Sequence, residues 1–182
     1  MPTFLFLHGW QGSEPGHWQR WLAAELAGRG HDVRFPDFAD PDEPDLAVWL
    51  AELREELARL EPAETTVLAH SLGCYVWLHH AAGSRDPVDR VLLVAPPSPE
   101  AVEQIGPIEL PVLDAGAAGR AARSTELVYA DDDPYWPGGA ASFAAALGVP
   151  AHRLPGAGHV NVAAGFGAWP EALAWCERRG TF

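Results

Sequence analysis

The sequence predicts an α/β fold with a six-stranded, mainly parallel sheet and helices on both faces. Short apolar runs of strand length alternate with longer segments whose apolar residues recur at helical spacing. One strand passes into a helix within three residues, around Ser71. Loops that carry histidine, serine or aspartate follow several strands, and the ends of parallel strands meet at one edge of a sheet.

The composition indicates one domain, residues 1–182, without a large cap domain. The formal net charge of −13 argues against nucleic acid and against anionic membrane surfaces as partners, because both require clustered basic groups. Cys74 and Cys176 have no spacing typical of metal or redox sites, and the apolar run at the N-terminus is too short for export. We therefore expect a reduced, cytoplasmic protein, and the sequence does not indicate its oligomeric state.

The first half of the chain contains three predicted strands. Apolar and β-branched runs place them at Thr3–Leu7, Asp32–Phe35 and Thr65–Ala69. Apolar residues at helical spacing predict helices over His17–Arg29, Leu46–Leu60 and from Gly73 onward. Gly30 is placed to end the first helix, and Asp45 to cap the start of the second.

The second half continues the alternation. Its strands are predicted at Val88–Val94, Thr125–Ala130 and Ala151–Leu154. Its helices are predicted at Glu100–Ile105, Ala140–Leu147 and Ala168–Arg178. Between them, Gly106–Ser124 is rich in Gly, Ala and Pro and has no periodic pattern, so we predict it mostly as connection.

Ser71 lies in the abrupt turn between the third strand and its helix. Such a turn forces its middle residue into a strained conformation with the side chain projecting outward, and it needs small residues two positions before and after. Ala69 and Gly73 occupy those positions, with Ala69 replacing the commoner glycine. The pentapeptide alone could equally arise by chance in a chain rich in Ala and Gly. The strand before it and the helix after it favour a nucleophilic serine.

A serine nucleophile needs an imidazole base, and His159 is the best placed of the eight histidines. It follows the last strand in a loop of small residues. His8 and His70 lie too close to rigid turns to swing onto the serine. The others are predicted on helices or at the opposite edge of the sheet: His17, His79 and His80 on helices, His31 and His152 at strand starts.

The carboxylate that orients the base is predicted among Asp131, Asp132 and Asp133, just past the fifth strand. The chain order Ser, Asp, His is the order expected of an α/β-hydrolase. Asp133 precedes Pro134, which restricts its backbone to an extended conformation that could aim the carboxylate. Three adjacent carboxylates could instead bind a hard cation, but no glycine-spaced acidic loop surrounds them, so we predict no metal site.

Two backbone N–H groups are expected to bind the oxyanion of a tetrahedral intermediate. One is that of Leu72 at the start of the helix, and the other is that of Trp10 after the first strand. Gln11, His70 and Trp136 lie in loops at the same predicted edge, so they are candidate residues of the substrate pocket.

Four stretches together resemble a known family, the small serine hydrolases of the retinoblastoma-binding-protein-9 and YdeN type. They are Leu7-His8-Gly9-Trp10-Gln11-Gly12-Ser13 with His17-Trp18-Gln19, Ala69-His70-Ser71-Leu72-Gly73, Asp133-Pro134-Tyr135, and Gly158-His159-Val160-Asn161. A fifth stretch, Gly165-Phe166-Gly167-Ala168-Trp169-Pro170-Glu171, resembles the bacterial branch. The resemblance implies an α/β-hydrolase fold with little lid, nucleophile Ser71, acid Asp133, base His159 and no cofactor.

These patterns predict a serine hydrolase that cleaves small ester or amide substrates through an acyl-enzyme on Ser71. Short acyl esters are the expected substrates, because no recognisable cap would enclose a long chain. Amidase or peptidase activity with the same residues is one alternative. A catalytically silent protein-interaction module is another, although such a module would not need all three residues in this order.

Overall fold

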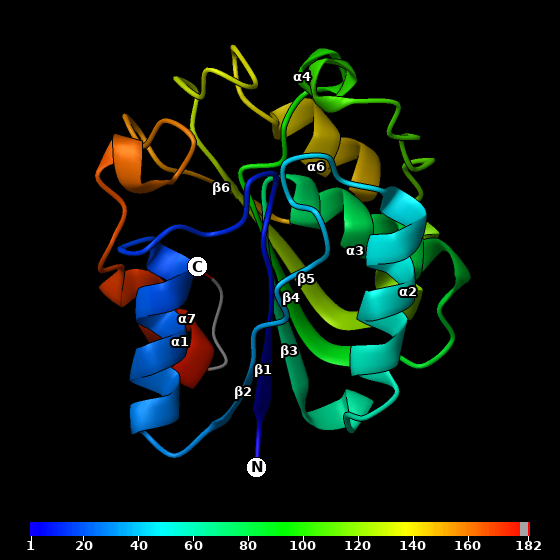
Figure 1. The fold of residues 1–182 in the computed structure, drawn as a ribbon, viewed down its shortest axis with the longest axis vertical. Coiled ribbons are helices and arrows are strands. Elements are labelled where there is room, and N and C mark those ends of the chain that lie inside the picture. The colour runs from blue at the N-terminus through cyan, green and yellow to red at the C-terminus, as the bar shows by residue number, and fades with distance from the viewer. Residues whose placement is uncertain (179–181) are drawn as a thin grey trace.

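A computed structural model describes residues 1–178 and 182. Its six strands form one sheet in the order β2-β1-β3-β4-β5-β6, and every pair of neighbouring strands is parallel. Figure 1 shows the strands in the middle of the molecule, with α1 and α7 to one side and α2, α3 and α6 to the other. The predicted fold class, a parallel sheet covered on both faces, is confirmed.

The strands agree closely with the sequence pattern. They are β1 Thr3–Leu7, β2 Asp32–Arg34, β3 Thr65–His70, β4 Val88–Val94, β5 Ala122–Tyr129 and β6 Ala151–Arg153. The helices are α1 Trp18–Gly28, α2 Leu46–Leu57, α3 Leu72–Gly83, α4 Pro99–Ile105, α5 Ala115–Ala121, α6 Ala141–Leu147 and α7 Pro170–Arg178. None of the described helices is long and apolar enough to cross a membrane.

The order of the strands reverses between β1 and β3. The chain goes from β1 to β2 on one side and then crosses to β3 on the other side of β1. In open parallel sheets, ligands bind beyond the carboxyl ends of the strands at such a reversal. The loops after β1 and β3, which contain Trp10 and Ser71, therefore meet at the position where a site is expected.

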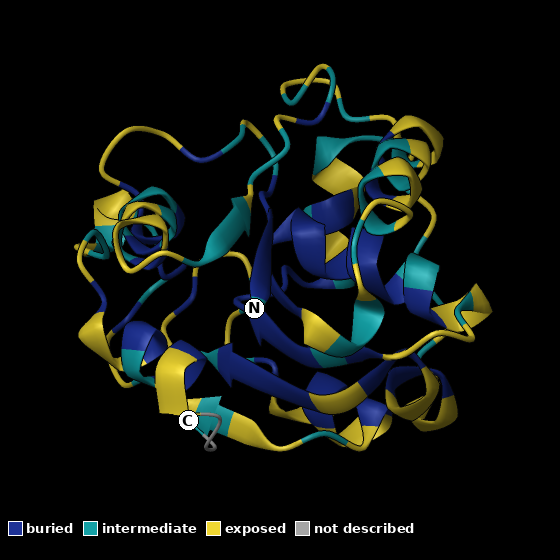
Figure 2. Ribbon diagram, turned by 90° about the horizontal axis from the view of Figure 1, so that it is seen from below, coloured by how far each residue is buried: buried dark blue, intermediate teal, exposed yellow. Residues whose placement is uncertain are grey.

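Two apolar cores hold the helices against the sheet. Leu5, Val67 and Leu93 face α2, α3, α5 and α6, with Trp49 and Trp77 in the same cluster. The alternate side chains of the strands face the other side, where they pack with residues of α1 and α7. In Figure 2 the strands are mostly buried, whereas the helices are exposed on their outer faces. Burial on both faces explains the nearly continuous apolar runs of β1, β3 and β4.

The two predicted capping positions, Asp45 and Gly30, are confirmed. Asp45 caps α2, because its Oδ1 accepts hydrogen bonds from the N–H groups of Ala47 and Val48 at 2.8 and 3.2 Å. Gly30 follows α1 with a φ of 86°, a conformation that favours glycine, and its N–H donates to the Ala27 carbonyl.

The prediction that Gly106–Ser124 is mostly connection is wrong for its second half, which contains α5 and the first residues of β5. α5 has no large apolar residue, so it gives no helical periodicity. Its buried residues are Ala117, Ala118 and Ala121. Small side chains allow a close approach to neighbouring elements, and α5 makes contacts with α3 and α6. Asp114 caps the helix by accepting a hydrogen bond from the Gly116 N–H.

Candidate active site

Ser71 occupies a strained turn between β3 and α3. Its φ of 53° and ψ of −123° lie outside the regions that L-residues ordinarily adopt. The Ser71 N–H donates to the Val94 carbonyl on the neighbouring strand, and the Ser71 carbonyl accepts from the Cys74 N–H. These bonds hold the backbone in the conformation that a nucleophile elbow requires.

Two glycines leave the space that this turn needs. A Cβ on Gly73 would lie 2.6 Å from the Leu7 carbonyl oxygen and 2.7 Å from that of His8. A Cβ on Gly9 would lie 2.7 Å from Cβ of Ser71. The end of β1, the following loop and the start of α3 therefore pack too closely for any side chain at either position.

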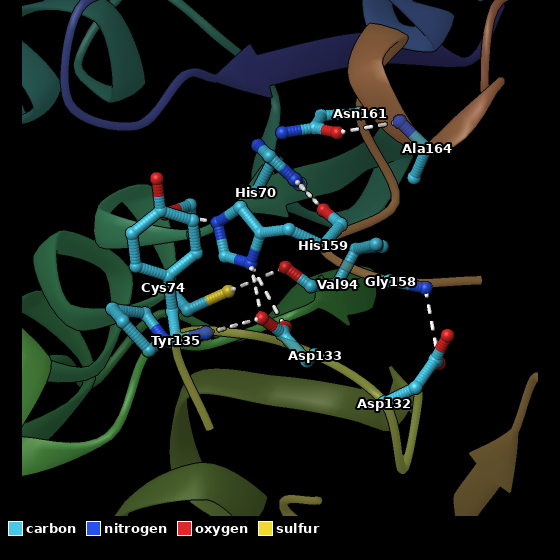
Figure 3. Close-up of polar contacts among 12 residues, drawn as sticks. His70, Cys74, Val94, Asp132, Asp133, Tyr135, Gly158, His159, Asn161 and Ala164 are labelled. Carbon is cyan, nitrogen blue, oxygen red and sulfur yellow. Dashed lines mark hydrogen bonds and ion pairs between the residues drawn. The ribbon is translucent and has the colours of Figure 1, made fainter. Parts of the chain in front are cut away.

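His159 lies between Ser71 and Asp133. Its Nε2 is 2.9 Å from the Ser71 hydroxyl oxygen, and its Nδ1 is 2.8 and 3.1 Å from the two oxygens of Asp133. Figure 3 shows the Asp133 carboxylate on one side of the imidazole and the Tyr135 ring beside the imidazole. The centres of the Tyr135 and His159 rings are 4.5 Å apart. Ser71, Asp133 and His159 are each at least nine-tenths buried. Proton transfer from the hydroxyl to the imidazole is possible at this distance.

The loop that carries His159 is held from two sides (Figure 3). The Gly158 N–H donates to Asp132 at 3.1 Å, and the His70 Nε2–H donates to the His159 carbonyl at 2.9 Å. Asp131 instead pairs with Arg153. The three adjacent carboxylates thus have three different partners, and no group of His, Cys, Asp or Glu among the described residues is arranged to hold a metal ion.

Of the two candidate oxyanion donors, Leu72 directly follows Ser71, and Trp10 lines the same cavity as Ser71. Leu72 is the first residue of α3, so its N–H has no acceptor within the helix. Trp10 follows β1, and its side chain is fixed by a hydrogen bond from Nε1 to the Asp42 carbonyl. No hydrogen bond of the described backbone uses the Trp10 N–H.

A cavity of about 240 Å³ opens above Ser71 and His159. The residues that line it are Trp10, Gln11, Gly12, Glu14, His17, His70, Ser71, Pro97, Ile105, Tyr135, His159 and Asn161. Gln11 and His70, two of the predicted pocket residues, are among them. Trp136 is not, because its ring packs edge to face against Phe143 in the core, and the neighbouring Tyr135 lines the cavity instead.

Sequence reasoning missed four polar or aromatic residues of the cavity, Glu14, His17, Tyr135 and Asn161. His17 was expected inside the first helix, but it is the N-cap of α1, and its extended backbone directs it away from the helix. The sequence contains no cap signal here, because Ser, Thr, Asp and Asn are the residues preferred at an N-cap. By contrast, His8 serves the structure: it accepts from the Phe38 N–H, and burial lowers its pKa.

A parallel sheet of this order, with a serine in a strained turn after β3 and a histidine after β6, defines an α/β-hydrolase. The chain belongs to the serine hydrolase family, which it matches over residues 4–178. It is therefore a hydrolase, and the resemblance to YdeN-type proteins is confirmed.

Solved structures share the fold over nearly the whole chain. The ydeN gene product of B. subtilis is 21% identical, with a TM-score of 0.84 and 98% of each chain covered. A YdeN-like hydrolase of Pectobacterium atrosepticum is 23% identical, with a TM-score of 0.71 and coverage of 96% of this chain and 88% of that one. Est1E of Butyrivibrio proteoclasticus, with bound ferulic acid, is 13% identical, with a TM-score of 0.70. The match covers 98% of this chain and 89% of Est1E. A comparison with curated protein sequences found no match.

Proposed function

We propose that this serine hydrolase cleaves small esters through an acyl-enzyme on Ser71. The observation that carries the proposal is the continuous set of hydrogen bonds from the Ser71 hydroxyl through His159 to Asp133, at 2.9 and 2.8 Å. A binding module has no use for a strained serine hydrogen-bonded to an oriented imidazole, and strain of this kind costs about 1–3 kcal/mol.

In the first half of the proposed reaction, Ser71 Oγ attacks the ester carbonyl carbon. The hydroxyl proton passes to Nε2 of His159, and Asp133 stabilises the imidazolium through Nδ1–H. The carbonyl oxygen becomes an oxyanion, which accepts hydrogen bonds from the N–H groups of Leu72 and Trp10. As the tetrahedral intermediate collapses, His159 returns the proton to the departing alkoxide, and the alcohol leaves.

In the second half, a water molecule attacks the acyl-enzyme. His159 accepts a proton from this water, the same N–H groups bind the second oxyanion, and the proton then passes to Ser71 Oγ as the acid is released. Each half-reaction uses the same three side chains, so no further acid or base is required.

The size of the cavity supports short substrates. A volume of about 240 Å³ is below the roughly 300–1,000 Å³ of typical sites for drug-sized ligands. Carboxylesterase CesB of Bacillus subtilis, a protein of the same fold, is an esterase by name. We therefore prefer esters to amides.

Labelling with a fluorophosphonate probe tests the proposed nucleophile. We expect stoichiometric modification at Ser71, none in Ser71→Ala, and a greatly reduced rate in His159→Ala. Ser84→Ala, at the other end of α3, is the matched control and should label like the native protein. Native protein that does not label would favour the alternative, a catalytically silent interaction module.

Matched ester and amide substrates test the preferred bond. With the same short acyl group and the same aromatic leaving group, we expect kcat/KM for the ester to exceed that for the amide. The reverse ranking would assign the chain to amidases or peptidases and leave the proposed nucleophile unchanged.

A further inference from the structure

Two histidines of the cavity take no part in the proposed chemistry. His17 and His70 both line it, with only 3% and 5% of their surfaces exposed. Their rings lie 4.8 Å apart, centre to centre, at an angle of 65°. The nitrogen atoms of these rings that have no partner in the described chain are not enclosed by protein, so they are open to a ligand in the cavity.

The tautomer of His17 is fixed by its position as a helix cap. Its Nδ1 accepts a hydrogen bond from the Gln19 N–H at 3.2 Å, so this nitrogen carries no proton. Burial, reinforced by the neighbouring His159, lowers the pKa of His17 to about 4, and the ring is therefore neutral at physiological pH. A neutral ring with a bare Nδ1 carries its proton on Nε2. None of the hydrogen bonds between described residues uses this Nε2–H donor.

His70 offers the cavity a hydrogen-bond acceptor, whereas His17 offers a donor. Its Nε2 faces the His159 carbonyl at 2.9 Å (Figure 3), and a carbonyl can only accept, so the proton is on Nε2. Burial holds the pKa of His70 well below its usual value. Its Nδ1 is therefore an acceptor, and no bond within the described part of the chain occupies it.

Asn161 adds a second donor to the same cavity. Its Oδ1 accepts a hydrogen bond from the Ala164 N–H at 3.1 Å, as Figure 3 shows. This bond fixes the orientation of the amide and leaves the NH₂ group without a partner in the described chain. The lining contains no Lys or Arg, and it includes Glu14. A neutral substrate group is thus favoured over an anion.

We propose that His17, His70 and Asn161 form a subsite for a hydroxyl group of the substrate, so that hydroxylated esters are the preferred class. A hydroxyl both accepts and donates, which matches the Nε2–H of His17, the Nδ1 of His70 and the amide of Asn161. Pro97 and Ile105 line the cavity as well and offer apolar contact for the rest of a short chain. This inference rests on the proposed esterase function and adds the chemistry of the substrate.

Two pairs of esters test the subsite and distinguish the side of the ester that carries the hydroxyl. One pair is nitrophenyl butyrate and nitrophenyl β-hydroxybutyrate, and the other is propyl butyrate and glycerol monobutyrate. We expect native protein to prefer the hydroxylated member of at least one pair by about tenfold or more in kcat/KM, because the alkyl ester leaves buried polar groups unpaired.

His17→Asn is the informative variant. Its side-chain oxygen can still cap α1, but the side chain ends before the position of Nε2. We expect the preference to fall below about threefold, whatever the absolute rate. His31→Asn, the same substitution just before β2 and outside the lining of the cavity, should keep the native preference.

The outcomes separate the two proposals. Labelling at Ser71 without a preference in either pair, or a preference that survives in His17→Asn, overturns the subsite alone. Absence of both labelling and turnover overturns the esterase. The tautomers can be read without activity from long-range proton–nitrogen spectra of the native protein, where we expect Nε2–H for both His17 and His70. The reverse tautomer at either ring would overturn the subsite independently.

Discussion

Asp133→Asn should reduce kcat by about 10⁴, whereas Asp132→Asn should change it by less than about threefold. Oδ1 of Asp133 accepts from the Tyr135 N–H at 2.8 Å, while Oδ2 accepts from Nδ1 of His159 at the same distance. An asparagine must keep its oxygen on the Tyr135 N–H, so its NH₂ group would face Nδ1 of His159. The imidazole would then move its proton to Nε2, where it could no longer accept the proton of Ser71.

A factor of 10⁴ corresponds to about 5.5 kcal/mol in the barrier. Asp132→Asn is equally isosteric and also removes one charge, but the amide oxygen that it introduces can still accept from the Gly158 N–H, as Asp132 does at 3.1 Å. The assay is kcat on a short acyl ester, with urea unfolding of both variants to show that they are folded. A loss below about tenfold at Asp133, or a larger loss at Asp132, would refute this account of the acid.

Three further predictions concern stability and reactivity. Gly73→Ala should destabilise the fold by about 1–3 kcal/mol in urea unfolding, because the added methyl group would overlap the carbonyl oxygens of Leu7 and His8. Gly83→Ala in the same helix is the control: its added methyl group meets open space, so this variant should be neutral or stabilising. His17 alone should lower native stability by about 2 kcal/mol from pH 6.5 to 5, because its pKa is lowered to about 4 in the folded state and only the unfolded chain gains the proton in this window. In urea unfolding, His17→Asn should remove this share of the pH dependence and leave the share of His8, His70 and His80, whose pKa values burial also lowers. Thiol reagents should modify neither Cys74 nor Cys176 before unfolding, since burial raises the pKa of both, that of Cys176 to about 12; rapid labelling of folded protein would contradict this.

Most of the fold could be predicted because its strands are buried on both faces. The apolar runs of β1 and β4 stand out from the polar loops around them, and their predicted bounds agree with the structure. α5 was missed because alanine and glycine give no contrast between a buried and an exposed face. The predicted helix over Leu46–Leu60 continues past the observed end at Leu57, since Leu60 packs against the core from the turn that follows.

In the candidate site, the positions of the three central side chains could be predicted from the sequence, but most of the cavity lining could not. Parallel strands bring their carboxyl ends to one edge of the sheet, and this rule predicts that Ser71, Asp133 and His159 lie close together. Their catalytic roles remain predictions. The lining of the cavity depends on the direction of each side chain within a loop. In the turn after β5, a shift of one residue separates Tyr135, which lines the cavity, from Trp136, which packs against the core.

Backbone strain explains why such loops resist prediction from local preferences. Five described residues other than glycine have positive φ, and each follows the end of a strand: Gln11, Asp40, Ser71, Ala95 and Val160. Val160, a β-branched residue at φ 48°, directly follows His159. Each such conformation costs about 1–3 kcal/mol and persists because neighbours hold it, as the Ala157 carbonyl holds the Val160 N–H. Residues chosen for local stability would relax these turns, and the Ser71 hydroxyl and the His159 ring would then lose the alignment on which the proposed chemistry depends.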